Sequence, residues 1–142
     1  MDRSASAVWN GSLKEGKGTI SSQSGALKQM QYSFAARFEQ GVGTNPEELI
    51  AAAHAGCFSM ALSLGLEKGG LTPESIKTSA KTYLEKDGEG FSIPKIQLTT
   101  EIKASGGDAE KIKAIALETK KQCPVSKALA SITIELEVKV AT

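Results

Sequence analysis

The feature that most constrains this chain is a stretch of eighteen residues, 49–66, that contains no Asp, Glu, Lys or Arg. Helix-start signals come directly before it: Asn45 can act as the N-cap, Pro46 takes the first helical position, and Glu48 stands three residues after the cap. The glycines at 69–70 supply a stop. The sequence therefore predicts one long helix, apolar on all sides, that ends just before these glycines.

Such a helix either spans a membrane or lies inside a protein. The stretch is at the lower length limit for a span. It also holds His54, Ser59 and Ser63, and much of the remainder is alanine. A helix that is apolar all round is usually buried in a protein. We therefore expect a buried central helix and no membrane partner.

The charges and the cysteines restrict the class of protein. The 142 residues include 17 basic and 16 acidic side chains, for a net charge of +1, and neither half is polarised. This argues against a nucleic-acid partner, which usually needs a clustered basic face. The polar first residues do not resemble a secretory signal. We expect a cytoplasmic chain whose two cysteines are catalytic, metal-binding or buried rather than a structural bridge.

Strand patterns and two further helices make up the rest of the chain. Strands are expected at residues 7–13, 19–21, 30–38, 76–85, 91–103 and 132–140. Helices are expected at residues 108–122 and 125–129, and residues 72–74 form a short turn or helical start. Pro94 should lie at a sheet edge or a bulge. Hairpin-length links favour antiparallel sheets, so the prediction is an α+β fold in a single domain, residues 1–142.

The central helix also predicts an oligomer. One sheet covers one side of it, and a single amphipathic helix cannot cover the remainder. Its small residues, including Ala53, Gly56 and Ala61, suit close approach by another backbone. We therefore expect a homodimer with this helix in its core.

Three residues stand out as candidates for chemistry. Cys57 lies in the middle of the central helix, where an inert buried thiol is the common alternative. Cys123 precedes Pro124, and at a helix start the backbone N–H groups lower the pKa of a thiol; a packing cysteine at a turn is the alternative. Arg37 lies among aromatic residues, where it needs a carboxylate or thiolate partner or else lies at the surface.

Other residues carry weaker signals. Glu47 and Glu48 both complement the helix dipole, and Glu48 fits the cap better. His54 and Cys57 share one helical face, so with Cys123 and Glu47 they form a candidate zinc site, although no second closely spaced pair exists. Several large side chains belong to the core or line a pocket for an apolar substrate: Tyr32, Phe34, Phe38, Phe58 and Met60.

Two motifs of the chain resemble those of a known family. Residues 43–61, GTNPEELIAAAHAGCFSMA, are similar to the signature of the osmotically induced protein C (OsmC) and organic hydroperoxide resistance (Ohr) superfamily. Residues 123–126, CPVS, resemble its second cysteine site. The pattern WxGxLxxGxG at residues 9–18 and the His-Ala pair at 54–55 are closer to the OsmC branch.

The resemblance implies an intertwined homodimer with two active sites at its interface and a peroxidase that needs no metal, haem or other cofactor. It implies that Cys57 is the peroxidatic cysteine and Cys123 the resolving one, joined in a disulfide during turnover. Arg37 and Glu47 match the charged pair that activates the thiolate. The implied substrate is an organic hydroperoxide, and the implied reductant is a dithiol of the dihydrolipoyl type.

Helix geometry limits how Glu47 can serve Cys57. Ten residues separate them, so they lie about 15 Å apart on a straight helix. Either Arg37 bridges this gap, or Glu47 comes from a partner chain, which is the alternative we favour. Three other functions stay open at this stage: a zinc-binding module, a stress protein that binds an apolar small ligand without turnover, and a purely structural dimer.

Overall fold

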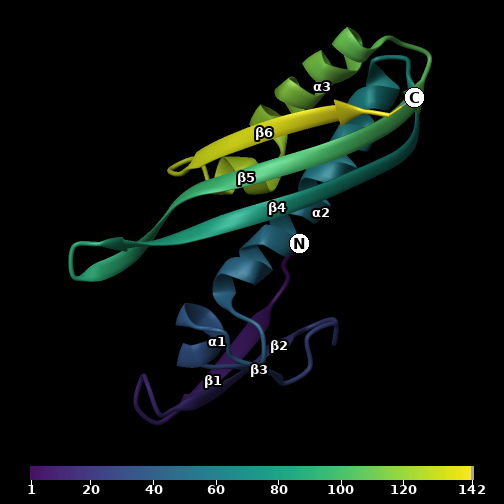
Figure 1. Cartoon of the computed structure of the whole chain (residues 1–142). Helices are drawn as coiled ribbons and strands as arrows, with labels where there is room; N and C mark the ends of the chain where they lie inside the picture. Colours follow the sequence, from purple (N-terminus) through teal and green to yellow (C-terminus); the bar gives the residue numbers. More distant parts are fainter. Residues whose placement is uncertain (142) are drawn as a thin grey trace. The chain divides into compact units, whose positions relative to one another are not determined.

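The computed structural model describes residues 1–141, and their contacts divide the chain into two units, Met1–Leu49 and the residues from Ile50 onward. Each unit has its own three-stranded sheet, with strand orders β1-β2-β3 and β4-β5-β6 (Figure 1). The α+β class is therefore confirmed.

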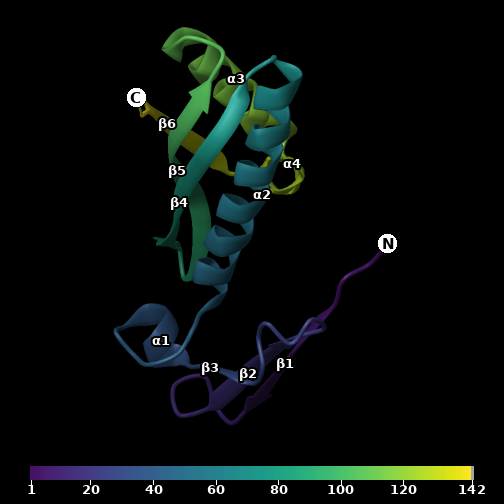
Figure 2. The ribbon, with the colours of Figure 1, turned by 90° about the vertical axis from the view of Figure 1, so that its right-hand side faces the viewer.

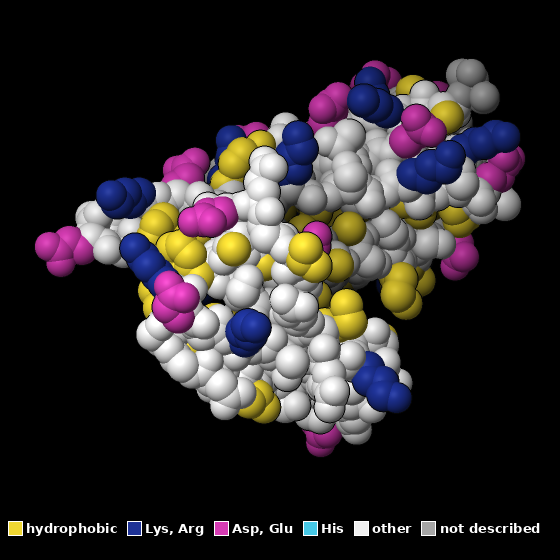
Figure 3. Space-filling model, turned by 60° about the horizontal axis from the view of Figure 1, so that its bottom comes forward, with side chains coloured by type: hydrophobic (Ala, Val, Ile, Leu, Met, Phe, Trp, Pro, Cys, Tyr) yellow, Lys and Arg dark blue, Asp and Glu magenta, His cyan; other side chains and the backbone are white. Residues whose placement is uncertain are grey.

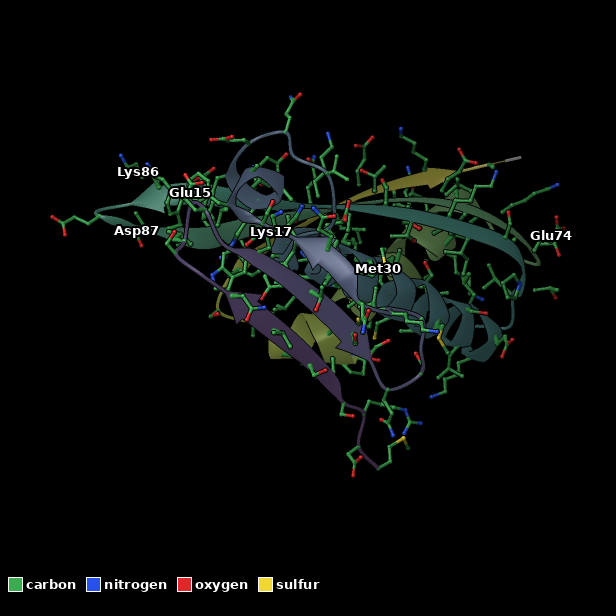
Figure 4. All side chains as sticks on the ribbon, turned by 90° about the horizontal axis from the view of Figure 1, so that it is seen from below. Glu15, Lys17, Met30, Glu74, Lys86 and Asp87 are labelled. Atoms are coloured by element: carbon green, nitrogen blue, oxygen red, sulfur yellow. The ribbon has the colours of Figure 1, made fainter. Side chains whose placement is uncertain are left out.

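The first unit is built on an antiparallel meander. It consists of β1 (Ala5–Asn10), β2 (Lys17–Ser22) and β3 (Met30–Tyr32). Figure 4 labels Lys17 at the start of β2 and Met30 at the start of β3, with Glu15 in the turn before β2. The rings of Trp9 and Tyr32 pack with centroids 5.3 Å apart. Both rings crowd the α-carbon of Gly18, so no side chain fits there.

The prediction of one strand over residues 30–38 is wrong. The strand ends at Tyr32, and the helix α1 (Phe34–Phe38) follows at once. Ser33 caps this helix, because its Oγ accepts a hydrogen bond from the Ala36 N–H at 3.2 Å. This bond satisfies a free N–H group at the start of the helix. The alternation of side chains, on which the strand prediction rested, does not reveal such a cap. Arg37 consequently lies on a helix and not on a strand.

The long helix α2 (Pro46–Lys68) begins and ends as predicted. The Asn45 Oδ1 accepts the Glu48 N–H at 2.8 Å, which is the expected N-cap bond. The helix ends at the glycine pair, where Gly70 adopts φ +81°.

By length and composition α2 is apolar enough to cross a membrane. Its buried residues instead pack into the core of the second unit, as the central helix of a soluble fold does.

Burial of α2 is confined to one face within this chain. From His54 onward the buried side chains of α2 recur every four residues: His54, Phe58, Leu62 and Leu66. On the other side Met60 is 78% exposed and Leu64 52% exposed. One sheet and two shorter helices leave a face of α2 uncovered, so the expectation that a single chain cannot cover this helix is confirmed.

The second unit places three strands against three helices. Strands β4 (Thr72–Asp87) and β5 (Gly90–Ser105) form an antiparallel hairpin, whereas β6 (Thr133–Val140) pairs with β5 in parallel. The connection from β5 to β6 runs through α3 (Ala109–Gln122) and α4 (Pro124–Ala128). Figure 2 shows α2, α3 and α4 on the same side of this sheet. The prediction of purely antiparallel sheets is wrong for β6, because this helical crossover brings the chain back in the same direction.

The hairpin of the second unit is longer than predicted. Residues 72–74 belong to β4 and do not form a turn, and Figure 4 shows Glu74 at one end of β4 and Lys86 and Asp87 at the other. The pairing shifts register between Tyr83 and Glu85, opposite Pro94. The expected bulge at this proline is therefore confirmed.

The core of the second unit lies between its sheet and its helices. Alternate residues of the central strand β5 point into it, namely Ile96, Leu98 and Ile102. The helices contribute the remaining fully buried apolar side chains, among them Phe58, Leu62, Leu66, Ile112 and Ala116. Cys123 belongs to the same cluster. One of the two candidate thiols is thus fixed by the core itself.

Candidate active site

The two cysteines meet in the second unit. Cys57 lies on α2 and is half-buried, whereas Cys123 lies between α3 and α4 and is fully buried. Their Sγ atoms are 3.3 Å apart although 66 residues separate them, and both are free thiols. The structure therefore brings together the pair whose proximity the sequence left open.

Cys123 is fixed by the junction between two helices. Its N–H donates to the Thr119 carbonyl at 2.9 Å as the last bond of α3, and its own carbonyl accepts the Lys127 N–H at 3.0 Å as the first bond of α4. Pro124 occupies the first position of α4, where no N–H is needed. The predicted helix start at Cys123 is confirmed, and backbone bonds on both sides hold this thiol in place.

The surroundings shift the pKa values of the two thiols in opposite directions. Burial raises the pKa of Cys57, and its contact with Cys123 adds to this, whereas a backbone bond from Val125 opposes it. Burial also acts to raise the pKa of Cys123, but the Ser126 N–H, the contact with Cys57 and the Ser126 hydroxyl outweigh burial and lower it. Within this unit the Val125 backbone bond favours the Cys57 thiolate but does not outweigh burial.

Arg37 and Glu47 form an ion pair in the first unit. The Nε and Nη2 atoms of Arg37 both donate to Oε1 of Glu47, at 3.1 and 2.8 Å. The Glu47 side chain is only 8% exposed, whereas that of Arg37 is 38% exposed and its guanidinium lies 5.2 Å from the centre of the Phe38 ring. Within residues 1–141 the Nη1 of Arg37 has no hydrogen-bond partner. The carboxylate thus fixes the arginine and leaves donors free for a further ligand.

Backbone geometry explains why this pair forms. Arg37 lies near the end of α1, and Glu47 lies in the first turn of α2. The amide of Asn45 donates to the Ala36 carbonyl at 3.2 Å and ties the two helix ends together. Thr44 donates to the Glu48 carboxylate at 2.8 Å, so this side chain is occupied at the start of α2.

A cavity of about 230 Å³ lies beside Arg37 in the first unit. Its lining is mainly aromatic: Trp9, Leu13, Tyr32, Ser33, Phe34, Arg37 and Phe38. Three of the five residues predicted as core or pocket line this cavity. The other two do not, because Phe58 is buried in the core of the second unit and Met60 is exposed on α2.

The single histidine is bound to a hydroxyl. His54 is fully buried, and its Nε2 lies 2.7 Å from the Oγ of Ser126. No group of three or more His, Cys, Asp or Glu residues placed to hold a metal ion occurs among residues 1–141, so the zinc alternative has no ligand set there.

On the face in Figure 3, basic and acidic side chains are interspersed, in line with the balanced composition.

Sequence reasoning assigned no role to Ser126. The structure places it at the third position of α4, buried and in contact with His54, and its hydroxyl is one of the groups that lower the pKa of Cys123. The available sequence signal was its place in the CPVS motif, three residues after the N-cap, where a side chain commonly faces the capping residue.

Comparison with known proteins identifies the family. Residues 39–137 match the family described as OsmC-like protein. The chain is 50% identical to Peroxiredoxin OsmC of Escherichia coli (strain K12), with 98% of each chain covered, and 33% identical to the organic hydroperoxide resistance protein OhrA of Bacillus subtilis (strain 168), with 67% of each covered.

Solved structures agree with this match. An OsmC-like protein from Mycoplasma pneumoniae shares the fold with a TM-score of 0.76 at 18% identity, covering 100% of this chain and 99% of that one. OhrB of Bacillus subtilis gives a TM-score of 0.68 at 26% identity, covering 97% and 98%. The chain therefore belongs to the OsmC-like protein family, as the sequence motifs predict.

Proposed function

We propose that this protein reduces organic hydroperoxides to alcohols through a disulfide between Cys57 and Cys123. The observation that carries the proposal is the 3.3 Å separation of two free thiols in a member of the OsmC-like family. The relative with 50% identity is named a peroxiredoxin, and the more distant ones are named organic hydroperoxide resistance proteins. The chain is thus a thiol-dependent peroxidase.

Cys57 performs the first step as a thiolate. Its sulfur attacks the distal peroxide oxygen, the O–O bond breaks, and an alcohol leaves while Cys57 becomes a sulfenic acid. Burial raises the pKa of Cys57, so the thiolate needs a cation beside it. Arg37, held by Glu47, supplies that cation and donates a hydrogen bond to the developing alkoxide. We favour an arrangement in which the Arg37–Glu47 pair beside each Cys57 comes from the partner chain.

Cys123 performs the second step. Its sulfur attacks the Cys57 sulfenic acid, which gives the disulfide and releases water. An external dithiol, proposed to be of the dihydrolipoyl type, then restores both thiols by thiol–disulfide exchange. A dithiol is favoured because its second thiol attacks the mixed disulfide, closes a disulfide within the reductant and releases the protein cysteine as a thiol.

The lining of the cavity in the first unit supports an organic substrate. Tyr32, Phe34 and Phe38 offer apolar surface for the organic part of a hydroperoxide, and Arg37 at the same cavity offers donors for its oxygens. Hydrogen peroxide lacks the apolar part. We therefore propose that bulky organic hydroperoxides are the preferred substrates.

The exposed face of α2 supports a homodimer. Ala52, Ala53 and Gly56 are exposed there and small enough for close approach of a second backbone, and Met60 and Leu64 add apolar surface. We propose that a second copy of this chain covers this face in a soluble cytoplasmic enzyme. Both units are proposed to act as one domain, since the OsmC relative aligns with 98% of the chain.

A peroxidase assay with purified protein tests the proposal. Cumene hydroperoxide and hydrogen peroxide are each supplied with dihydrolipoamide or with the monothiol glutathione, and Cys57→Ser serves as the inactive control. We expect fastest turnover with cumene hydroperoxide and the dithiol. Absence of turnover in every combination would overturn the proposal.

The aromatic cavity also favours a second candidate, the binding of an apolar small ligand without turnover. In that case a fluorescent apolar probe binds equally to the parent protein and to Cys57→Ser, and neither consumes peroxide.

A further inference from the structure

His54 is buried beside the two thiols and takes no part in the steps above. It lies on α2 three residues before Cys57, and α2 lies against α4 in Figure 2. Its Nε2 is 2.7 Å from the Oγ of Ser126, which is 72 residues away in the chain. Its Nδ1 is buried and has no hydrogen-bond partner among residues 1–141. Burial lowers the pKa of this ring, so the imidazole is neutral near pH 7.

The unpartnered Nδ1 fixes the position of the ring proton. A neutral imidazole carries one proton, on either Nδ1 or Nε2. A buried N–H without an acceptor is less tolerable than a bare lone pair. The proton of His54 therefore lies on Nε2, which donates to the Oγ of Ser126. The hydroxyl proton of Ser126 then remains available for another acceptor.

The place of Ser126 in α4 determines that acceptor. Cys123 is the N-cap of α4 and Ser126 is three residues later, a spacing at which the two side chains commonly meet across the first turn. Both are buried, at 0% and 4% exposure. The Ser126 hydroxyl is also one of the groups that lower the pKa of Cys123. The sulfur of Cys123 is thus the acceptor that this geometry offers.

We infer that His54 is a positioning residue for the resolving thiol and acts through a hydrogen-bond chain from Nε2 to the Ser126 hydroxyl to Sγ of Cys123. The inference rests on the proposed function, because it concerns the second step. There the Cys123 sulfur bonds to the Cys57 sulfur and the S–O bond of the sulfenic acid breaks. The hydroxide that leaves takes the proton released by the Cys123 thiol and forms water. Cys123 is oxidised and Cys57 is reduced to the disulfide level.

Two rates separate this role from a general effect on activity. Stopped-flow mixing with cumene hydroperoxide measures sulfenic acid formation at Cys57 and the disulfide formation that follows it. In Ser126→Ala and His54→Leu we expect the first rate within about twofold of the parent. The second should fall about tenfold, as for the loss of one hydrogen bond to a charged group. In His54→Gln the amide N–H replaces Nε2–H and should restore most of the rate.

A second readout does not depend on peroxide chemistry. In the Cys57→Ser background, where Cys123 is the only thiol, the ultraviolet absorbance of its thiolate is followed against pH, and we expect Ser126→Ala to move this profile to higher pH. The matched control is Ser59→Ala, which removes a hydroxyl bonded to the Ala55 carbonyl and Thr78. Identical Cys123 profiles with and without the Ser126 hydroxyl would overturn the inference. Inactivity of the parent toward all peroxides would overturn the proposed function and leave this measurement standing.

Discussion

The sulfur atoms of Cys57 and Cys123 lie 3.3 Å apart, one on a 23-residue helix and the other between two helices. A disulfide needs a separation of about 2.05 Å, so the sulfurs must approach by only about 1 Å. Backbone bonds on both sides of Cys123 hold it in this position. The pair is consequently arranged for a disulfide that forms without unfolding of either element.

Peroxide should therefore produce an intrachain disulfide between Cys57 and Cys123. Less than one equivalent of cumene hydroperoxide per chain is added, and the oxidised protein is digested and mapped by mass spectrometry. A map that contained only interchain or over-oxidised species would contradict the proposed pairing.

Single substitutions should separate the two thiols by role. Cys57→Ser should abolish turnover, because no other thiolate is placed to attack the peroxide. Cys123→Ser should still consume about one peroxide per chain and then stall or over-oxidise, because the sulfenic acid has no resolving partner. Quantitative peroxide consumption distinguishes the outcomes, and equal activity of both variants would refute the assignment.

Arg37→Ala should leave the Cys57 thiol with a higher pKa and slow its attack on peroxide, because burial already disfavours the thiolate. Glu47→Ala should act more weakly, since Glu47 only orients the guanidinium. Arg37→Lys should restore part of the rate, because an ammonium lacks the planar fork. The measurement is Cys57 alkylation against pH in the Cys123→Ser background. Superimposable profiles would show that Arg37 does not activate the thiolate, and only the two cysteines would remain assigned to the site.

Mixed dimers should reveal which chain supplies Arg37. Arg37→Ala protein, which we expect to be slow, is exchanged with Cys57→Ser protein, which we expect to be inactive. If the arginine acts across the dimer, each mixed dimer contains one complete site, and the rate rises above that of the Arg37→Ala protein alone. If it acts within its own chain, every site lacks one residue and the rate does not rise, which would contradict the arrangement we favour.

Local signals in the sequence predicted the elements that hold the site. The Asn45 cap, Pro46 and the glycines at 69–70 specify both ends of α2, because each acts within a few residues of the helix end. The start of α4 at Cys123 follows from Pro124 in the same way. The Ser33 cap was missed, because a serine inside an alternating apolar pattern fits a strand equally well.

Long-range contacts explain what the sequence did not reveal. The parallel pairing of β6 depends on how α3 packs on the sheet, and no residue of β6 itself encodes a direction. The contact of His54 with Ser126 joins residues 72 apart, and the thiol pair joins residues 66 apart. Such contacts depend on the packing of α4 against α2. The family motif pointed to the cysteines, whereas Ser126 required the structure.

Ala53→Glu should prevent dimer formation. Ala53 lies on the exposed face of α2, and a second copy packed there would bury the introduced carboxylate without a partner. The matched control is Ala114→Glu, which makes the same change at an exposed position of α3. Light scattering at micromolar concentration should give a dimer for the parent and the control only. A folded and active parent monomer would contradict the proposed assembly.

The free energy of unfolding should decrease as the pH is lowered through the range in which His54 titrates. Burial lowers the pKa of this ring below its usual 6.5 in the folded state. Above that value the ring is neutral in both states, and the full stability is present. As the pH falls below it, the unfolded chain binds a proton that the folded chain excludes. The free energy of unfolding then decreases, with a slope of at most about 1.4 kcal/mol per pH unit, until the folded pKa is reached.

His54→Gln should flatten this dependence, because His54 is the single histidine of the chain. The measurement is urea unfolding of both proteins at pH 7.5, 6.5 and 5.5, at one protein concentration because dimerisation contributes to stability. Glutamine keeps an N–H donor for Ser126 and does not titrate. The parent should therefore lose stability relative to the variant as the pH falls. Parallel curves over this range would show that His54 titrates alike in the folded and unfolded chains, contrary to its burial.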